Sequence, residues 1–446
     1  TMLGTGVSAI TFLTHPAKSY ADNWVFIVQN FMAIISVIVT VTIFVPFFRR
    51  LRITTAYEYL EMRFNLATRM FCSISYVFAQ FGRVGVVLFI PALALSSVTG
   101  FNIYACILFM GILATFYTVF GGMEAVVWTD VMQVIILFGG AILCLIILLT
   151  DISGGVTEVI TVGMEYDKFS LGSLSFDITT DTLWIMLAGQ FFFAFLGVSD
   201  QTGVQRLLIT KDEKEARKSV WIWYVITLFT GVLFYGLGTA LFVYYQANPL
   251  ELNPILQNDS ILPWFITTKI PVGVAGLIVS AIFAASMSSV DSSMNSVATV
   301  VVVDYYRRFC RQAKEQHAMM IARIVTLLMG IIAITIALVM ATYKEQIKSL
   351  LEFYWELHAL LVATAGGIFL LGMLTKRANG KGAIVGAIGG SSALYFVKVY
   401  TDIHFLLYTA IGIVTGMTVG YFVSLLTGRP PEAKVDKLTI YTMEEN

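Results

Sequence analysis

Apolar stretches long enough to cross a membrane recur along almost the whole chain. They lie near residues 24–47, 66–97, 102–120, 125–150, 182–207, 219–246, 271–306, 318–342, 349–374, 382–399 and 404–427. A helix needs roughly 20 apolar residues to cross the hydrocarbon core of a bilayer. The pattern therefore predicts eleven membrane-spanning helices. We expect an all-α polytopic membrane protein in which residues 1–446 form a single transmembrane domain.

Basic residues gather in alternate connections between these stretches, at 49–52, 211–218, 307–314 and 376–381. The intervening connections, 151–181 and 247–270, contain one lysine each. The positive-inside rule places the basic connections in the cytoplasm. Counting back from them, we expect the numbered sequence to begin partway through a span, with further residues upstream of Thr1.

Composition agrees with this class of protein. Hydrophobic residues make up 58% of the 446 residues and charged residues 13%, and the mean hydropathy is +0.82. The formal net charge is zero, which argues against a nucleic-acid partner because phosphate binding needs a basic surface. Four scattered cysteines and four dispersed histidines have no metal-ligand or catalytic spacing, so we do not expect an enzyme.

The stretch at 271–306 is unusual because polar side chains occupy its middle. Six serines lie within the eleven residues 286–296, and Asp291 stands among them. A charged side chain at the centre of a bilayer costs roughly 2.5–3.5 kcal/mol on insertion scales. Asp291 is therefore expected to face a cavity, an ion or a partner group, which indicates a transporter. The alternative for the serines is that each donates to a carbonyl oxygen one turn earlier.

Two stretches contain interruptions at membrane depth. The sequence GTGVSAITF (4–12) opens with glycines and small hydroxyl residues, and FLGVSDQTG (195–203) interrupts an aromatic run. Such residues weaken a helix and free its carbonyl groups, which hydrocarbon tolerates only beside a cavity. Close helix packing through small residues is the alternative for the first segment. Paired interruptions are the best sequence indication of a substrate site in an inverted-repeat transporter.

Motifs in five separate places resemble the sodium/solute symporter family, which includes sodium/glucose, monocarboxylate, vitamin and iodide symporters. They are TAYEYLEMRF (55–64), VFGGMEAVVWTDVMQ (119–133), VQRLL (204–208), GTALFVYYQANP (238–249) and AIFAASMSSVDSSMNS (281–296). Two further segments resemble the bacterial sialic acid symporter branch, ITFLTHPAKSYADNWVFI (10–27) and FGRVG (81–85).

The resemblance implies a five-plus-five inverted-repeat (LeuT-like) core. Residues 1–150 are expected to form the first repeat, with a truncated first helix, residues 182–374 the second repeat, and residues 382–427 accessory helices. It also implies a sodium-coupled symporter in a bacterial inner (plasma) membrane that imports a small organic solute by alternating access. An acidic sugar such as sialic acid (N-acetylneuraminate) is the first expectation. A monocarboxylate, a neutral sugar, or a role as a solute sensor module remain open.

The resemblance further implies sodium sites made of oxygen ligands, which a small hard cation prefers. The first site comprises the carbonyl groups of Gly4, Val7 and Ala285 and the hydroxyl groups of Ser288 and Ser289. The second comprises Asp130, Ser288, Asp291 and Ser292. Asp291 departs from the branch, which has serine there, so the coupling ions are one or two sodium ions, or a proton in place of the second. For Asp130, a helix-capping or ion-pairing role is the alternative.

Arg83 lies well inside the stretch 66–97. Its guanidinium is always charged and grips carboxylates in a bidentate manner, so it predicts an anionic substrate, with pairing to an internal acid as the alternative. The resemblance assigns Arg83 to the substrate carboxylate. It adds other substrate-binding residues, namely Ser8, Thr11, Phe26, Asn30, Asp200 and Gln201. Glu352, Glu356 and His358 could form an outer-vestibule cluster, but we expect them to be solvated residues at a helix end.

Overall fold

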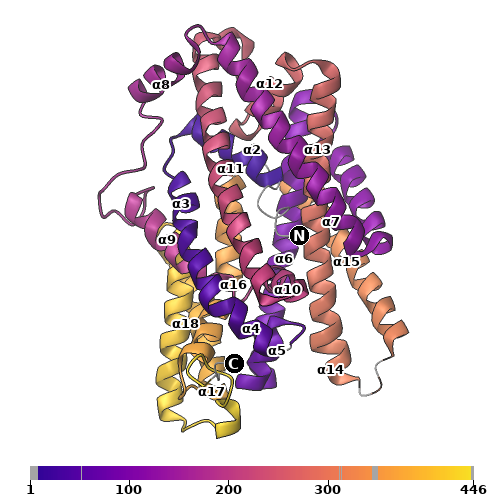
Figure 1. Ribbon diagram of the computed structural model, residues 1–446, viewed down its shortest axis with the longest axis vertical. Coiled ribbons are helices and arrows are strands. Elements are labelled where there is room, and N and C mark those ends of the chain that lie inside the picture. Colours follow the sequence, from indigo (N-terminus) through magenta and orange to yellow (C-terminus); the bar gives the residue numbers. More distant parts are fainter. Residues whose placement is uncertain (1–8, 52, 311, 313, 344–349, 443–446) are drawn as a thin grey trace.

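The computed structural model describes residues 9–51, 53–310, 312, 314–343 and 350–442, without the side chains of residues 97, 98, 120–131, 350 and 351. This part of the chain forms an elongated bundle of α-helices (Figure 1). Its one β interaction is an isolated bridge between Ser173 and Thr182.

Helices account for each of the eleven predicted spans. Nine helices in the described part of the chain are long and apolar enough to cross a membrane. A further span is a bent pair of helices, Leu183–Leu196 and Gln201–Ile209, and the stretch Ile103–Val119 is a shorter apolar helix. The prediction of an all-α polytopic membrane protein is therefore confirmed.

The first half of the chain forms α2 (Ala9–Ala21), α3 (Ile27–Val39), the π-helix η1 (Thr40–Phe44), α4 (Val45–Leu51), α5 (Ala56–Arg63), α6 (Leu66–Thr99), α7 (Ile103–Asp151) and α8 (Gly155–Glu165). The predicted spans 102–120 and 125–150 both lie within α7. Side-chain caps satisfy first-turn N–H groups here: Thr55 and Glu58 form a capping box on α5, and Asn65 accepts from the Thr68 N–H at the start of α6.

The second half forms α9 (Leu183–Leu196), α10 (Gln201–Ile209), α11 (Glu213–Ala247), η2 (Pro249–Glu251), η3 (Asn258–Ser260), α12 (Ile261–Lys269), α13 (Val272–Val300), the π-helix η4 (Val301–Tyr306), α14 (Arg307–Phe309), α15 (Glu315–Thr342), α16 (Leu350–Leu374), α17 (Gly380–Tyr400), α18 (Leu406–Leu426) and η6 (Glu432–Lys434). In Figure 1, α4, α5, α14 and the C-terminus lie at the lower end and α8 and α12 at the upper end. The lower end therefore carries the basic connections at 49–52 and 307–314, which are predicted to be cytoplasmic.

The interruption predicted at residues 195–203 is present. Helix α9 ends at Leu196, α10 begins at Gln201, and their axes are bent by 56°. Asp200 caps α10 by accepting a hydrogen bond from the Thr202 N–H at 3.0 Å, and Ser199 Oγ donates to the Leu196 carbonyl at 2.9 Å. Side chains of the break therefore form hydrogen bonds with some of the backbone N–H and C=O groups that the helix ends leave free, as burial at membrane depth requires. Residues 4–8 of the other predicted interruption lie outside the described residues.

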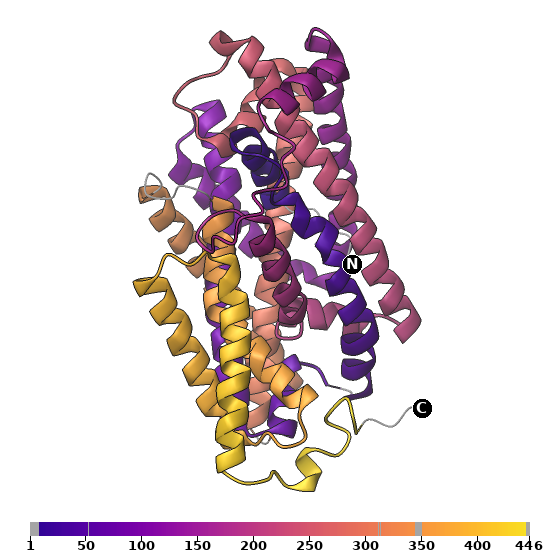
Figure 2. The same cartoon turned by 90° about the vertical axis from the view of Figure 1, so that its left-hand side faces the viewer.

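The last two spanning helices pack through glycines at one side of the bundle (Figure 2). A Cβ atom at Gly386 would lie 2.5 Å from the Gly416 carbonyl oxygen, and one at Gly382 would lie 2.4 Å from that of Gly420. Small residues at this spacing let two helix backbones approach closely. Helices α17 and α18 also contact α16, so they lie against the bundle and line neither of the cavities described next.

Candidate substrate and ion sites

A cavity of about 310 Å³, here called the lower cavity, lies beside the break between α9 and α10. Charged and titratable side chains from three parts of the chain line it, namely Arg83, Asp200, Arg206, Tyr354 and His358. Phe44 and Phe48, on the η1–α4 segment that leads toward the end predicted to be cytoplasmic, also contribute to its wall. A concave site with a few converging polar groups is the usual form of a small-molecule site.

A second cavity of about 170 Å³, here called the upper cavity, is lined mainly by uncharged polar side chains. These are Thr11, His15, Gln29, Asn30, Gln190, Thr227 and Thr230. Phe26 and Tyr235 add aromatic surface. Hydrogen-bonding groups beside aromatic rings suit a polyhydroxylated ligand, because each hydroxyl needs a partner when it leaves water.

Three aromatic residues, Phe193, Trp223 and Trp355, line both cavities. Phe193 and Trp355 meet edge to face, with ring centroids 5.1 Å apart and an interplanar angle of 87°. We call this trio the aromatic partition. The predicted substrate residues fall on its two sides: Thr11, Phe26 and Asn30 line the upper cavity, and Arg83 and Asp200 the lower one.

Arg83 and Gln80 share one face of α6 and carry buried atoms without hydrogen-bond partners among the described residues. These atoms are Nε of Arg83 and both amide atoms of Gln80. Gln80 is 1% exposed. Leaving such groups unmet in the interior costs free energy, so a ligand or water is expected to meet them.

Asn30 and Gln201 are held in different ways. The Asn30 amide donates to the Thr227 carbonyl at 3.4 Å, and it fits because residue 231 is glycine: a Cβ atom there would lie 2.2 Å from Asn30 Nδ2. Gln201 lines neither cavity. Its amide accepts from the Ala56 N–H at 2.8 Å and donates to the Thr54 carbonyl at 3.2 Å, so it holds the connection before α5.

The predicted ion-binding residues of α13 are buried except Ser289, which is half-buried. Ser288 is 4% exposed, Asp291 0% and Ser292 9%. Ser289 Oγ donates to the Ala285 carbonyl at 3.1 Å, which is the backbone hydrogen bond that formed the alternative for these serines. The same contact brings two predicted sodium ligands together. Gly4, Val7 and Ser8 lie outside the described residues.

Asp291 and Ser292 contact neighbouring helices. The carboxylate of Asp291 accepts hydrogen bonds from the hydroxyl groups of Tyr117 and Thr118 on α7. Ser292 Oγ accepts from Arg206 Nη2 at 2.9 Å. The polar middle of α13 therefore faces protein groups, as its sequence predicts. The side chain of Asp130 lies outside those that the structure describes.

An ion-pair cluster joins the outer ends of several elements. Lys18 Nζ of α2 lies 2.8 Å from Glu352 Oε1 of α16, 2.9 Å from Asp22 Oδ2 and 3.5 Å from Asp181 Oδ2, and Asp181 also bonds His404 at 2.8 Å. Burial raises the pKa of Asp181, but the hydrogen bond to His404 and the charge of Lys18 outweigh burial and hold that pKa below its usual value.

The expectation of a solvated outer-vestibule cluster on α16 is wrong for His358. That side chain lines the lower cavity. Glu352 pairs with Lys18, and Glu356 pairs with Lys398 on α17. The physical reason is that α16 is packed on several sides, so positions spaced by a few residues meet different environments.

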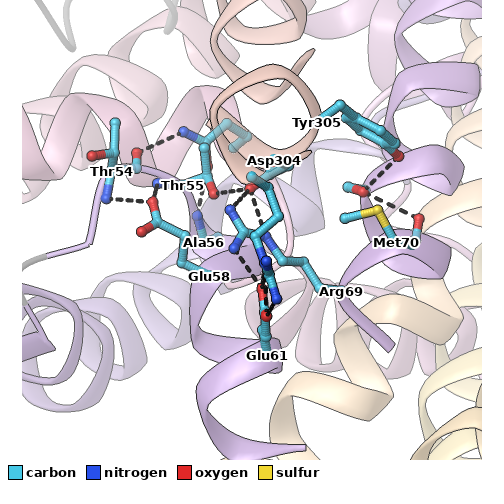
Figure 3. A network of polar contacts seen from close by, with 12 residues as sticks. Thr54, Thr55, Ala56, Glu58, Glu61, Arg69, Met70, Asp304 and Tyr305 are labelled. Atoms are coloured by element: carbon cyan, nitrogen blue, oxygen red, sulfur yellow. Dashed lines mark hydrogen bonds and ion pairs between the residues drawn. The ribbon is translucent and has the colours of Figure 1, made fainter. Parts of the chain in front are cut away.

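A second polar network lies around Asp304 and Arg69, at the end of the bundle that is predicted to be cytoplasmic (Figure 3). Asp304 of η4 is fully buried and accepts from Thr55 Oγ1 at 2.7 Å and from Arg69 Nε at 2.9 Å. Arg69 Nη1 also bonds Glu61 at 2.8 Å, and Arg308 Nε bonds the same carboxylate at 2.9 Å. The hydrogen bond from Arg308, with Arg69 beside it, holds the pKa of Glu61 below its usual value. The network joins α5, α6 and the end of the α13–η4 span.

The family model of the sodium:solute symporter family matches residues 1–390. The chain belongs to this family. It is a multi-pass membrane protein and a transporter rather than an enzyme. The match confirms the resemblance inferred from the five motifs.

Individual relatives agree with this assignment. The sodium/sialic acid symporter NanT of Aliivibrio fischeri is 33% identical over 94% of this chain and 83% of its own length. The sodium/sialic acid symporter SiaT of Proteus mirabilis is 34% identical over 98% of this chain and 88% of its own. The solved substrate-bound, outward-open state of a Na⁺-coupled sialic acid symporter matches with a TM-score of 0.89 at 33% identity, over 96% of this chain and 89% of that one. The LeuT-like fold expected from the sequence is therefore confirmed.

Arg206, His15 and Gln190 were not identified by sequence reasoning, although they line the cavities or contact a predicted ion ligand. For Arg206 the signal was present, since the VQRLL motif follows the helix break directly. His15 and Gln190 carry no such signal, because isolated polar residues in apolar helices do not show which neighbour they meet.

Proposed function

We propose that this protein is a sodium-coupled symporter that imports an acidic sugar, sialic acid in the first instance, across a bacterial plasma membrane. The observation that carries the proposal is the buried, unpaired Nε of Arg83 in a cavity that adjoins a second cavity lined by hydroxyl and amide groups. A guanidinium supplies the charge for a carboxylate, and the polar upper cavity supplies partners for hydroxyls. The names of the relatives NanT and SiaT support the same substrate.

The two cavities suggest how such a substrate lies. Its carboxylate pairs with Arg83 on one side of the aromatic partition, and its hydroxyl-rich part lies among Thr11, His15 and Asn30 on the other. A ligand that reaches both sides requires Phe193 and Trp355 to separate from their edge-to-face contact. Binding is therefore coupled to movement of α9 against α16, the helices that carry these two rings.

Sodium is a co-transported substrate in this proposal. Ala285, Ser288 and Ser289 of α13, with Gly4 and Val7, provide the first site, so binding of the ion links the first helix to α13. Asp291, Ser288, Ser292 and Asp130 provide the second. Oxygen donors of these kinds are the ligands that hard cations prefer.

A monocarboxylate is a weaker candidate for a physical reason. It would satisfy Arg83 but would leave the hydroxyl and amide groups of the upper cavity without partners, and a site built for hydrogen bonds rejects ligands that lack them. A neutral sugar would meet the hydroxyl and amide groups of the upper cavity but would leave Arg83 without a carboxylate to bind.

Uptake into proteoliposomes tests the proposal. Purified protein is reconstituted, and entry of labelled sialic acid is followed under an inward sodium gradient and under the same gradient of potassium. We expect accumulation only with sodium, and competition by unlabelled sialic acid but not by monocarboxylates or neutral sugars. A thermal-shift series with the same compounds gives an independent readout, since a ligand that binds only the folded state raises the melting temperature. Equal uptake with potassium, or stabilisation by a monocarboxylate alone, would contradict the proposal.

A further inference from the structure

A groove of about 480 Å³ runs between α7 and α15 on the outer surface of the bundle, separate from the two cavities. Its apolar lining is Ile112, Phe116, Val119, Met320, Ile324, Leu327, Ile331 and Ile334. Thr115 is buried at its floor, where the helices touch: a Cβ atom at Gly330 would lie 2.0 Å from Thr115 Oγ1. Gly330 thus lets the backbones of α7 and α15 approach closely. The larger side chains on either side of this contact form the walls of the groove.

Among the described residues that line this groove, Arg323 alone carries a charge. It is exposed, and among the described residues it has no hydrogen-bond or ion-pair partner. No acidic residue lies within one turn of it on α15, where residues 319–327 read MMIARIVTL. A guanidinium that none of the described side chains pairs, on an apolar and membrane-facing surface, favours binding of an anion, because charged groups in hydrocarbon are otherwise costly.

Arg323 lies in the part of α15 nearer the end that is predicted to be cytoplasmic. Helix α15 begins at Glu315 on the cytoplasmic side, and Arg323 lies eight residues later, about 12 Å along the axis. From Arg323 to Ile334 the groove follows α15 for eleven residues, about 16 Å. One leaflet contributes about half of the roughly 30 Å hydrocarbon core. The groove therefore has the length of one lipid chain, with a positive charge where the headgroup begins.

We propose that this groove binds one anionic glycerophospholipid of the cytoplasmic leaflet, with its phosphate on Arg323 and one acyl chain along Phe116, Leu327 and Ile331. Basic positions between transmembrane helices on the cytoplasmic side bind anionic headgroups through such contacts. A zwitterionic lipid carries a cationic headgroup that competes for the same phosphate, so the anionic lipid binds more tightly.

The site is connected to ion binding through α7. Phe116 and Val119 face the groove, while Tyr117 and Thr118 between them donate hydrogen bonds to Asp291. A lipid chain against one face of this turn therefore packs behind the hydroxyl groups that hold Asp291 on the other face. Occupancy of the groove fixes the position of this turn of α7.

Native mass spectrometry of the detergent-purified full chain tests the site, with phosphatidylglycerol and phosphatidylcholine as probes. The variants are Arg323→Ala, with Lys218→Ala as a control that removes one exposed cytoplasmic charge elsewhere, and Leu327→Trp, with Leu328→Trp as its control. Leu327 and Leu328 are 50% and 52% exposed, but only Leu327 lines the groove.

We expect one tightly retained phosphatidylglycerol in the parent and in both controls. Arg323→Ala should weaken it about fivefold, the factor that corresponds to roughly 1 kcal/mol for one basic residue at a membrane surface. Leu327→Trp should displace it by filling the groove. Equal retention of phosphatidylcholine by the parent, unchanged phosphatidylglycerol binding in Arg323→Ala or in Leu327→Trp, or a dimer that Leu327→Trp dissociates would each overturn the proposal.

Discussion

Lys18 Nζ and Glu352 Oε1 lie 2.8 Å apart, although 334 residues separate them in the sequence. The pair joins α2 to α16, whose residues Thr11, His15 and Trp355 line the upper cavity. Lys18 is mostly buried and meets two further carboxylates, Asp22 and Asp181. Helices α2 and α16 are therefore joined by an ion pair on the side of the candidate substrate site that is predicted to be external.

Removing one charge of this pair should open the external side. We expect Glu352→Gln to increase the rate at which a membrane-impermeant maleimide labels Asn30→Cys in intact cells by about fivefold, corresponding to roughly 1 kcal/mol for a partly exposed pair. Glu356→Gln is the matched control, because Glu356 lies on the same helix but pairs with Lys398. An equal labelling rate in the parent and in Glu352→Gln would show that the pair does not close the upper cavity.

Arg83 should determine the preference of the transporter for an anionic substrate. Arg83→Ala and Arg83→Lys are expected to weaken binding of sialic acid by roughly 2–5 kcal/mol, because truncation leaves the ligand carboxylate unpaired. Calorimetry on the purified protein with sodium present measures this. Binding of a neutral sugar analogue serves as the reference. An affinity for sialic acid that stays at the parent level would mean that Arg83 has a structural role only.

Ser288 and Ser289 should be needed for sodium-driven uptake. Ser288→Ala and Ser289→Ala are each expected to abolish accumulation in proteoliposomes while the melting temperature stays near that of the parent. Ser293→Ala is the control on the same helix, since Ser293 Oγ is buried without a partner among the described residues and is not a predicted ligand. Normal uptake in both alanine variants would exclude the first sodium site as proposed.

Asp291 distinguishes two coupling schemes. Because Tyr117 and Thr118 donate hydrogen bonds to its carboxylate, we expect the ionised form, a second sodium ion and a stoichiometry of two sodium ions per substrate. The reversal potential under opposed sodium and substrate gradients measures this number, and Asp291→Ser should change it. If a proton replaced the second sodium ion, uptake would depend on pH. A one-to-one ratio that the substitution leaves unaltered would mean that Asp291 has no part in coupling.

Asp259 should make stability depend on pH. It lies in the external turn η3, which packs against α2, and burial raises its pKa from 3.8 to about 7. An acid whose folded pKa is raised costs stability as pH rises above its unfolded pKa, and the full cost is reached above the folded value. We therefore expect Asp259→Asn to raise the melting temperature more at pH 8 than at pH 5. Asp177→Asn, in an exposed loop, is the control. A gain that is the same at both pH values would contradict the assignment.

The helices and the helix break were predictable because their causes are local. Continuous apolar stretches define the spans, and the glycine, serine and aspartate clustered in FLGVSDQTG all have low helix propensity, which favours a break at that place. The burial of Asp291 was predictable for a similar reason, since hydrocarbon excludes a carboxylate.

The contacts that organise the site were not predictable in this way. Lys18 with Glu352, and Arg206 with Ser292, join residues that are far apart in the chain. His358 was expected in solvent because it follows Glu352 and Glu356, yet it lines the lower cavity. A single sequence gives the type of each residue, but the packing of α16 against its neighbours decides which environment that residue meets.

The amide of Gln201 has a consequence for how the lower cavity opens toward the cytoplasm. It holds the backbone at Thr54 and Ala56, and Thr55 between them holds Asp304, which in turn holds Arg69 (Figure 3). A tilt of helix α10 therefore disturbs a series of hydrogen bonds that ends at Arg69 on α6. Movement of α10 therefore requires several of these hydrogen bonds to change together. The inner side of the transporter should accordingly switch between two discrete positions, with few intermediate ones.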